Sequence, residues 1–173
     1  MRPPLNLEYV LNASEKESEV MSLRLSTEEA WAVIEDAHTG IFTTLRADGW
    51  PIALPVWFVA LDRSICLGAP AQTKKVSRVT NDPRASFLVE SGERWSELLA
   101  VHVTGRVERI EDDDSRDRVR RLIDAKYANF RTATTAMPDA TSDHYASTVY
   151  LRLIPDDRIL SWDNERIALR EEQ

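Results

Sequence analysis

The stretch that most constrains this fold runs from Trp50 to Leu61, because it is apolar on both faces of the strand that it predicts. Successive side chains of a strand point to opposite sides. An antiparallel strand normally exposes one face to water, so the second face here needs a cover. A partner subunit or a flat aromatic ligand would supply that cover. The alternating sets are Ile52, Leu54, Val56, Phe58 and Ala60 on one face and Ala53, Pro55, Trp57 and Val59 on the other.

A short basic helix is predicted at residues 73–81, and Pro83 ends it because proline resists helix continuation. Gln72 or Thr73 would lie near the N-cap, which places Lys74 and Lys75 in the first turn. The helix dipole is already positive there, so lysines are unfavourable unless an anion is bound. Free backbone amides, a positive helix end and two lysines together form a phosphate-type site. The alternative is a solvated lysine pair on a surface helix.

Bulk composition narrows the class of protein. A chain of 173 residues fits one domain with a real core. Its formal net charge of -7 argues against nucleic acid as a partner, since phosphate binding needs a basic field. The single cysteine, Cys66, excludes an internal disulfide, and its place in a strand predicts a packed thiol. His38, His102 and His144 are scattered without ligand spacing, so no metal site is expected.

The chain has no recognisable signal peptide and no apolar run near the roughly 20 residues that span a bilayer. We therefore expect no membrane partner and a cytoplasmic location. Residues 1–22 are polar and predict an N-terminal tail, and residues 23–173 predict a single domain.

The order of elements predicts a mainly β (α+β) fold of about six to seven antiparallel strands with peripheral helices. Ser26 to Glu29 form a capping box that opens the first helix. Gly105 predicts a bulge or a bend at a barrel corner. A loop follows at residues 131–145. Strands are expected at 41–46, 50–61, 64–69, 85–90, 98–110, 148–154 and 158–162, and helices at 26–36, 73–81 and 111–128.

Four motifs together resemble the flavin-binding split-barrel superfamily of pyridoxamine 5'-phosphate oxidase-like proteins, over about residues 26–166. The similarity is greatest to the branch of reductases that use the deazaflavin coenzyme F420. The motifs are Asp48-Gly49 followed by Leu54-Pro55-Val56-Trp57-Phe58, then Thr73-Lys74-Lys75 with Asp82-Pro83-Arg84, then residues 89–98 followed by Val101 and Gly105, and finally Ser161-Trp162-Asp163.

The resemblance implies a split β-barrel that forms a homodimer and binds F420 or FMN in a groove between the subunits. It implies an oxidoreductase that passes hydride to a small planar substrate, with the chemistry carried by the cofactor rather than by an acid–base residue, so no catalytic residue is assigned. By resemblance the cofactor ring would lie against Leu54, Pro55, Val56 and Trp57. The cofactor phosphate would be bound by Thr73, Lys74 and Lys75, with Arg78 in the same basic cluster. Trp162 would approach the cofactor from the second subunit.

The sequence departs from the branch pattern at three places. Arg78-Val79-Thr80-Asn81 stands where relatives often carry Asn-Leu-Arg-Arg, Leu99-Ala100 where they often carry Arg-Gly, and Asn164-Glu165-Arg166 where they often carry His-Arg-Lys. Each change removes a basic or flexible group near the expected site. FMN, with one phosphate, needs fewer cations than F420 with its anionic tail. Two other functions stay open: a non-catalytic dimer that binds FMN, F420 or a tetrapyrrole, and a cofactorless dimer kept for a protein interaction.

Overall fold

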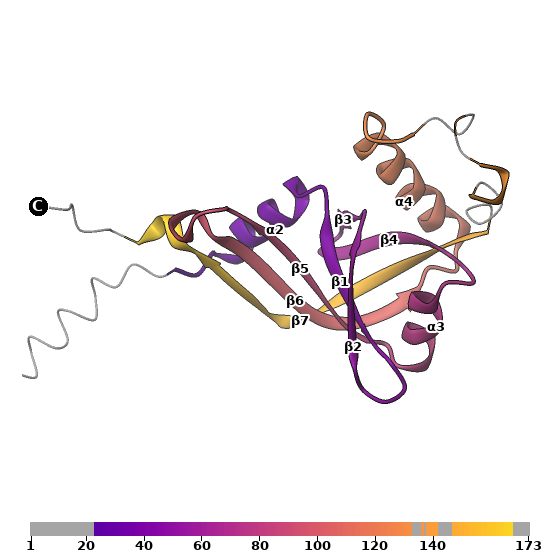
Figure 1. Ribbon diagram of the computed structural model, residues 1–173, viewed down its shortest axis with the longest axis horizontal. Helices are drawn as coiled ribbons and strands as arrows, with labels where there is room; N and C mark the ends of the chain where they lie inside the picture. The colour runs from indigo at the N-terminus through magenta and orange to yellow at the C-terminus, as the bar shows by residue number, and fades with distance from the viewer. Residues whose placement is uncertain (1–22, 133–135, 137, 142–146, 168–173) are drawn as a thin grey trace, which may run out of the picture.

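The computed structural model describes residues 23–132, 136, 138–141 and 147–167 (Figure 1). The predicted tail at residues 1–22 lies outside the described residues, as does part of the predicted loop at 131–145. The helices are α2 (Thr27–Asp36), α3 (Lys74–Asn81) and α4 (Asp113–Lys126), with short 3-10 turns η1 (Trp95–Glu97) and η3 (Asn164–Arg166). The strands are β1 (Gly40–Leu45), β2 (Pro51–Val56), β3 (Val59–Leu61), β4 (Ser64–Pro70), β5 (Arg84–Ser91), β6 (Leu99–Arg109) and β7 (Thr148–Asp163).

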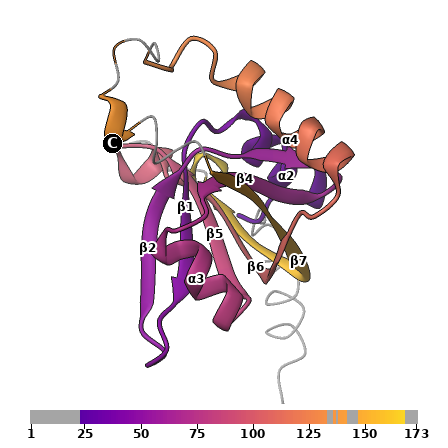
Figure 2. The ribbon, with the colours of Figure 1, turned by 90° about the vertical axis from the view of Figure 1, so that its right-hand side faces the viewer.

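All the strands form one antiparallel sheet in the order β2-β1-β5-β6-β7-β4-β3, which confirms the mainly β split-barrel fold. The sheet curls, with α2 and α4 on one side of it in Figure 1 and α3 beside β1 in both views (Figures 1 and 2). The capping box is present, since the Ser26 hydroxyl accepts from the Glu29 N–H and the Glu29 carboxylate accepts from the Ser26 N–H. No helix in the described part of the chain is long and apolar enough to cross a membrane.

The prediction of one strand from Trp50 to Leu61 is wrong. The chain leaves the sheet after β2 and re-enters it as β3 at the opposite edge. The break lies at Trp57 and Phe58. There a side chain takes the place of a neighbouring strand as hydrogen-bond partner, since the Phe58 N–H donates to the Tyr127 hydroxyl at 2.9 Å. Within β2 only Val56 is buried, so most apolar side chains of that half remain exposed at one edge of the sheet, whereas β3 lies at the other edge.

The prediction of two separate C-terminal strands is also wrong, because β7 continues through the expected break. Gly105 pairs with Pro155 and Val103 pairs with Ile159, so Thr104 alone faces residues 156–158 across a bulge. The bulge at Gly105 was predicted and is confirmed. A Cβ at Gly105 would lie 2.1 Å from the Ile154 carbonyl oxygen, which explains why this close approach of two strands requires glycine.

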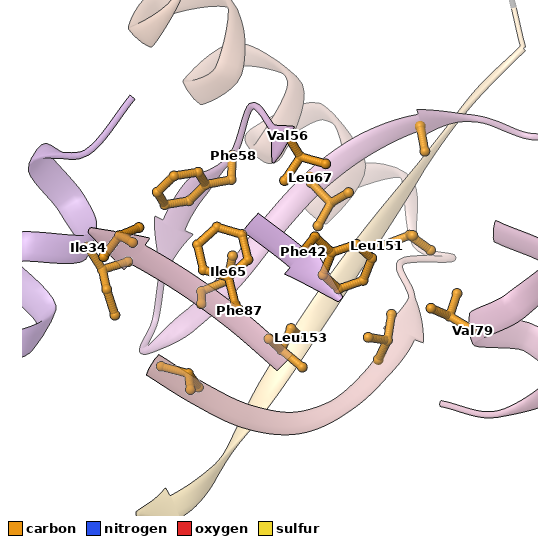
Figure 3. Packing of buried hydrophobic residues seen from close by; sticks show 14 of the residues in the cluster. Ile34, Phe42, Val56, Phe58, Ile65, Leu67, Val79, Phe87, Leu151 and Leu153 are labelled. Carbon is orange, nitrogen blue, oxygen red and sulfur yellow. The ribbon is translucent and has the colours of Figure 1, made fainter. Parts of the chain in front are cut away.

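Two apolar clusters form the interior. The larger one fills the space between the curled sheet and α2, with Phe42, Phe58 and Phe87 fully or almost fully buried at its centre (Figure 3). Burial of each such ring stabilises the fold by about 1.5–3 kcal/mol. The smaller cluster lies under α4 and comprises Val59, Cys66, Ile110, Val119, Ile123 and Tyr127. Cys66 is fully buried there, as predicted, and burial raises the pKa of its thiol.

Candidate functional site

A hollow of about 470 Å³ lies where the end of β2, the strand β4 and the start of α3 meet. Four of its lining residues were predicted from the sequence as cofactor-binding: Pro55, Val56, Trp57 and Lys75. We refer to it as the β2–α3 hollow. Its size falls within the range of small-molecule sites. Its remaining lining residues are Thr39, Gly68 and Pro70.

Lys75 supplies the charge of the β2–α3 hollow. Its side chain is half-buried, and burial, with a smaller contribution from Arg78, lowers the pKa of its ammonium. Among the residues that the structure describes, no carboxylate forms an ion pair with it. A partly desolvated cation without a counterion is unfavourable unless an anion completes it. An anionic ligand in the hollow would supply that counterion.

The start of α3 adds uncapped amides beside Lys75. Thr73 occupies the N-cap position, but its hydroxyl donates to the Pro70 carbonyl oxygen at 2.8 Å and no side chain caps the helix. The N–H groups of the first turn therefore stay available to a ligand, as at other helix starts that bind anions. Lys74 is exposed on the same turn, outside the lining of the hollow.

Arg78 has a structural contact as well as a charge. Its Nε–H donates to the hydroxyl of Thr44 at 2.8 Å, and Thr44 is 2% exposed. This bond ties α3 to β1 and so fixes the lysines relative to the sheet. Burial of a hydroxyl without such a partner would cost stability.

Trp57 forms the aromatic wall of the β2–α3 hollow. It is 42% exposed, and one face of its ring stacks on Tyr127 with centroids 4.4 Å apart and planes 5° apart. The Tyr127 hydroxyl lies 2.8 Å from the carbonyl oxygens of both Phe58 and His38, to either of which it can donate. Because one face stacks on Tyr127 and the ring is still 42% exposed among the described residues, part of the indole remains accessible to a planar ligand.

Five of the nine predicted residues do not line the hollow. Thr73, Lys74 and Arg78 belong to α3 and its N-cap beside it, whereas Leu54 and Trp162 lie elsewhere on the sheet. Leu54 pairs with Phe42 on the concave side of the sheet and remains 41% exposed. Trp162 pairs with Ala100 near the end of β7, at the opposite end of the molecule from α3 (Figure 1). A contact between Trp162 and the hollow requires a second copy of the chain.

Sequence reasoning missed the residue that holds the wall, Tyr127. In the sequence Tyr127 is only a residue near the end of the helix expected at 111–128, where its spacing fits an apolar helix face. No local signal marks a tyrosine whose partner, Phe58, lies 69 residues away. Only its position at the end of α4, over the break between β2 and β3, makes the contact.

A second, larger hollow of about 670 Å³ lies between the start of α2, the β3–β4 turn and the bulge of β7. None of the predicted site residues lines it. Its lining is acidic, with the carboxylates of Glu28, Asp62, Asp156 and Asp157 against the guanidinium groups of Arg63 and Arg158, so it does not suit an anionic ligand. Arg63 is already paired with Glu28 at 3.2 Å. The β2–α3 hollow is therefore the better candidate for a ligand site, although it is the smaller of the two.

The β2–α3 hollow suits a planar, anionic ligand rather than a metal. Among residues 23–132, 136, 138–141 and 147–167, no three His, Cys, Asp or Glu side chains gather as metal ligands. The lining combines one cation, two prolines, a valine and an indole, beside the uncapped amides of the helix start. These groups can bind and orient an anionic aromatic molecule.

Comparison with known proteins agrees with this geometry. The family model described as pyridoxamine 5'-phosphate oxidase matches residues 26–157. No curated protein matches the chain. Among solved structures, a conserved hypothetical protein from Mycobacterium tuberculosis is 25% identical with a TM-score of 0.72, over 87% of this chain and 92% of the other.

Two further structures share the fold at lower identity. An FAD-binding protein from Mesorhizobium loti is 20% identical with a TM-score of 0.61, over 79% of this chain and 93% of that one. A haem storage protein from Vibrio cholerae is 12% identical with a TM-score of 0.61, over 79% and 94% respectively.

Proposed function

The chain belongs to the pyridoxamine 5'-phosphate oxidase family, and on that premise we propose that it is a flavin- or deazaflavin-dependent oxidoreductase that acts as a homodimer. The cofactor is F420 or FMN, and the substrate is a small planar acceptor. The observation that carries the proposal is Lys75: a half-buried ammonium with no acidic partner in the described part of the chain, next to an uncapped helix start and the partly exposed indole of Trp57.

Each part of the β2–α3 hollow has a role in this proposal. Lys75 and the first-turn amides of α3 bind the cofactor phosphate, with Lys74 and Arg78 adding positive field. Pro55, Val56 and Trp57 lie against the ring system and exclude water from one side of it. A bound flavin or deazaflavin supplies hydride transfer to an electron-poor acceptor. The protein contributes binding and orientation.

A second subunit completes the groove in this proposal. The hollow lies beside α3 at one end of the molecule. Trp162 lies near the end of β7 at the opposite end and is 37% exposed. An antiparallel arrangement of two copies brings Trp162 of one to the hollow of the other. This is the role that the family resemblance assigned to it.

Titration of the purified protein with FMN and, separately, with F420 tests the cofactor. We expect saturable binding of one of the two, with the tighter one identifying the native cofactor. Reduced cofactor is then mixed with a quinone or an enone in the absence of oxygen. Reoxidation that depends on the protein supports the oxidoreductase. Binding without turnover favours a non-catalytic carrier, and binding of neither contradicts the proposal.

A tetrapyrrole-binding dimer is the second candidate, because a structure of the same fold is a haem storage protein. His38 precedes Thr39, which lines the hollow, and its ring packs 4.8 Å from that of Phe130. Among the described histidines, His38 is the one that adjoins the lining of the hollow in the sequence, which makes it the candidate iron ligand in this alternative. Addition of haem distinguishes the candidates: a Soret shift that His38→Ala removes would favour the tetrapyrrole binder.

A further inference from the structure

Among the described residues, Tyr127 is the only aromatic residue whose ring stacks on that of Trp57. The two planes differ by 5° at a centroid distance of 4.4 Å, so the orientation of the indole follows that of the phenol. Tyr127 is fully buried, whereas Trp57 is 42% exposed and lines the β2–α3 hollow. The fixed member of the stack is therefore Tyr127.

The hydroxyl of Tyr127 fixes the backbone beside Trp57 as well. It accepts from the Phe58 N–H at 2.9 Å and lies 2.8 Å from the Phe58 carbonyl oxygen. Phe58 is the residue at which the chain has left β2 and has not yet entered β3. One side chain thus accepts from the backbone N–H at the break, can donate to the carbonyl oxygen of Phe58 or of His38, and supports the ring of the preceding residue.

Tyr127 is itself held from several directions. It is the C-cap residue of α4, where its N–H donates to the Ile123 carbonyl oxygen at 3.1 Å. The His38 ring meets it edge-on at 6.2 Å, and the hydroxyl also reaches the His38 carbonyl oxygen. A side chain with this many constraints occupies one orientation, which it passes to Trp57.

We propose that Tyr127 is a positioning residue of the β2–α3 hollow, which it serves by setting the plane of the Trp57 ring and the path of the chain at Phe58. The proposal rests on the proposed function for its effect on cofactor binding. Its physical basis is preorganisation: a wall already in its binding orientation loses less side-chain entropy when the ligand binds.

The first test uses the protein without cofactor. The near-ultraviolet circular dichroism band of Trp57 is isolated by subtracting the spectrum of the Trp57→Phe variant. The same subtraction is made in a Tyr127→Leu background. We expect the Trp57 band to collapse there. Tyr150→Leu is the matched control, since Tyr150 packs against the same cluster under α4 without a recorded ring contact to Trp57. An unchanged Trp57 band in Tyr127→Leu would overturn the proposal.

The second test is a double-mutant cycle on cofactor affinity, using whichever of FMN or F420 the wild-type protein binds. Tyr127→Leu and Trp57→Leu are each expected to raise Kd by roughly five- to tenfold, the size of a lost oriented aromatic contact. If Tyr127 acts through Trp57, the double variant has the Kd of Trp57→Leu alone. Additive losses would show that Tyr127 only stabilises the fold.

Where Tyr127→Leu does not fold, Tyr127→Phe takes its place in the cycle, because it keeps the stacked ring and removes only the hydroxyl. Its loss of affinity is again expected to vanish in the Trp57→Leu background. The two proposals fail separately: wild-type protein that binds neither cofactor contradicts the proposed function, whereas the spectrum of Trp57 still decides whether Tyr127 orients it.

Discussion

At the scale of single residues, Lys75 and Lys74 differ although they are neighbours on one helix. Lys75 is half-buried and lines the β2–α3 hollow, whereas Lys74 is exposed. The sequence pattern alone does not distinguish the two lysines, because both fall in the first turn of the helix. Because charge-assisted contacts strengthen when they are shielded from water, the two should contribute unequally to anion binding.

We expect Lys75→Ala to weaken cofactor binding about tenfold or more, since a hydrogen bond to a charged group contributes about 1.5–3 kcal/mol. Lys74→Ala, the matched control on the same turn, should change Kd less. Fluorescence titration of each variant measures both. Lys126 would be a poor control, because its ammonium donates to the Glu35 and Ala37 carbonyl oxygens and so holds the end of α2. Equal effects of the two alanine variants would mean that the lysines are only a solvated pair.

Arg166 carries the second prediction at this scale: pyridoxamine phosphate should not be oxidised at a useful rate. A phosphorylated substrate needs cations in addition to those that bind the cofactor. Arg166 is the basic residue after Trp162, and its guanidinium is already bound by Glu29 at 2.7 Å and by Asp163 at 3.1 Å. Peroxide release at about 1 per second with FMN under air, an ordinary enzymatic rate, would contradict this prediction.

At the scale of elements, the chain around the start of α2 is bound to the C-terminal end of β7. The Asp163 N–H donates to the Leu23 carbonyl oxygen, and the Leu25 N–H donates to the Ser161 hydroxyl. The capping-box residue Glu29 also pairs with Arg166, so one carboxylate serves the helix start and the contact between elements. Hydrogen bonds from Ser26 and Arg166 lower the pKa of Glu29 from 4.5 to about 2.

This depressed pKa predicts a loss of stability in acid. A carboxylate whose pKa is lower in the folded state stabilises the fold above its unfolded pKa of about 4.5 and loses that contribution as pH falls towards 2. Glu29→Gln should therefore flatten the fall of Tm between those two values. Thermal unfolding followed by circular dichroism at a series of pH values measures it. Glu35→Gln on the same helix provides the same charge change, and an equal flattening in that variant would argue against Glu29.

At the scale of the whole molecule, a row of four apolar residues and one histidine crosses the convex face of five adjacent strands. The ladder register places Pro55, Ile41, Leu88, His102 and Leu160 side by side on β2, β1, β5, β6 and β7. Pro55 and Leu160 are exposed, the latter at 44%. Prolines within β2 lack the N–H that edge-to-edge pairing would need. A second copy would therefore cover this face rather than extend the sheet.

We expect a homodimer in sedimentation at micromolar concentration, with roughly 2,000 Å² or more buried between the subunits. Leu160→Glu should shift the protein towards monomer, because it places a charge at the exposed β7 end of this row. Phe130→Glu is the matched control, since Phe130 is more exposed, at 58%, and lies outside the row. A wild-type monomer, or equal dissociation of both variants, would contradict the predicted interface.

Local patterns in the sequence were sufficient for the element types, the capping box at Ser26, the bulge at Gly105 and the helix that begins beside Lys75. The capping box and the helix start depend on residues a few positions apart. Gly105 marks its bulge in the sequence, although the strand that approaches it, at Ile154, is distant along the chain. The path of the chain after Val56, the continuity of β7 and the support of Trp57 by Tyr127 depend on groups far apart in sequence. Tertiary structure decided these, because backbone groups at a break need partners, and those partners come from whichever side chain the packed fold brings within hydrogen-bond distance.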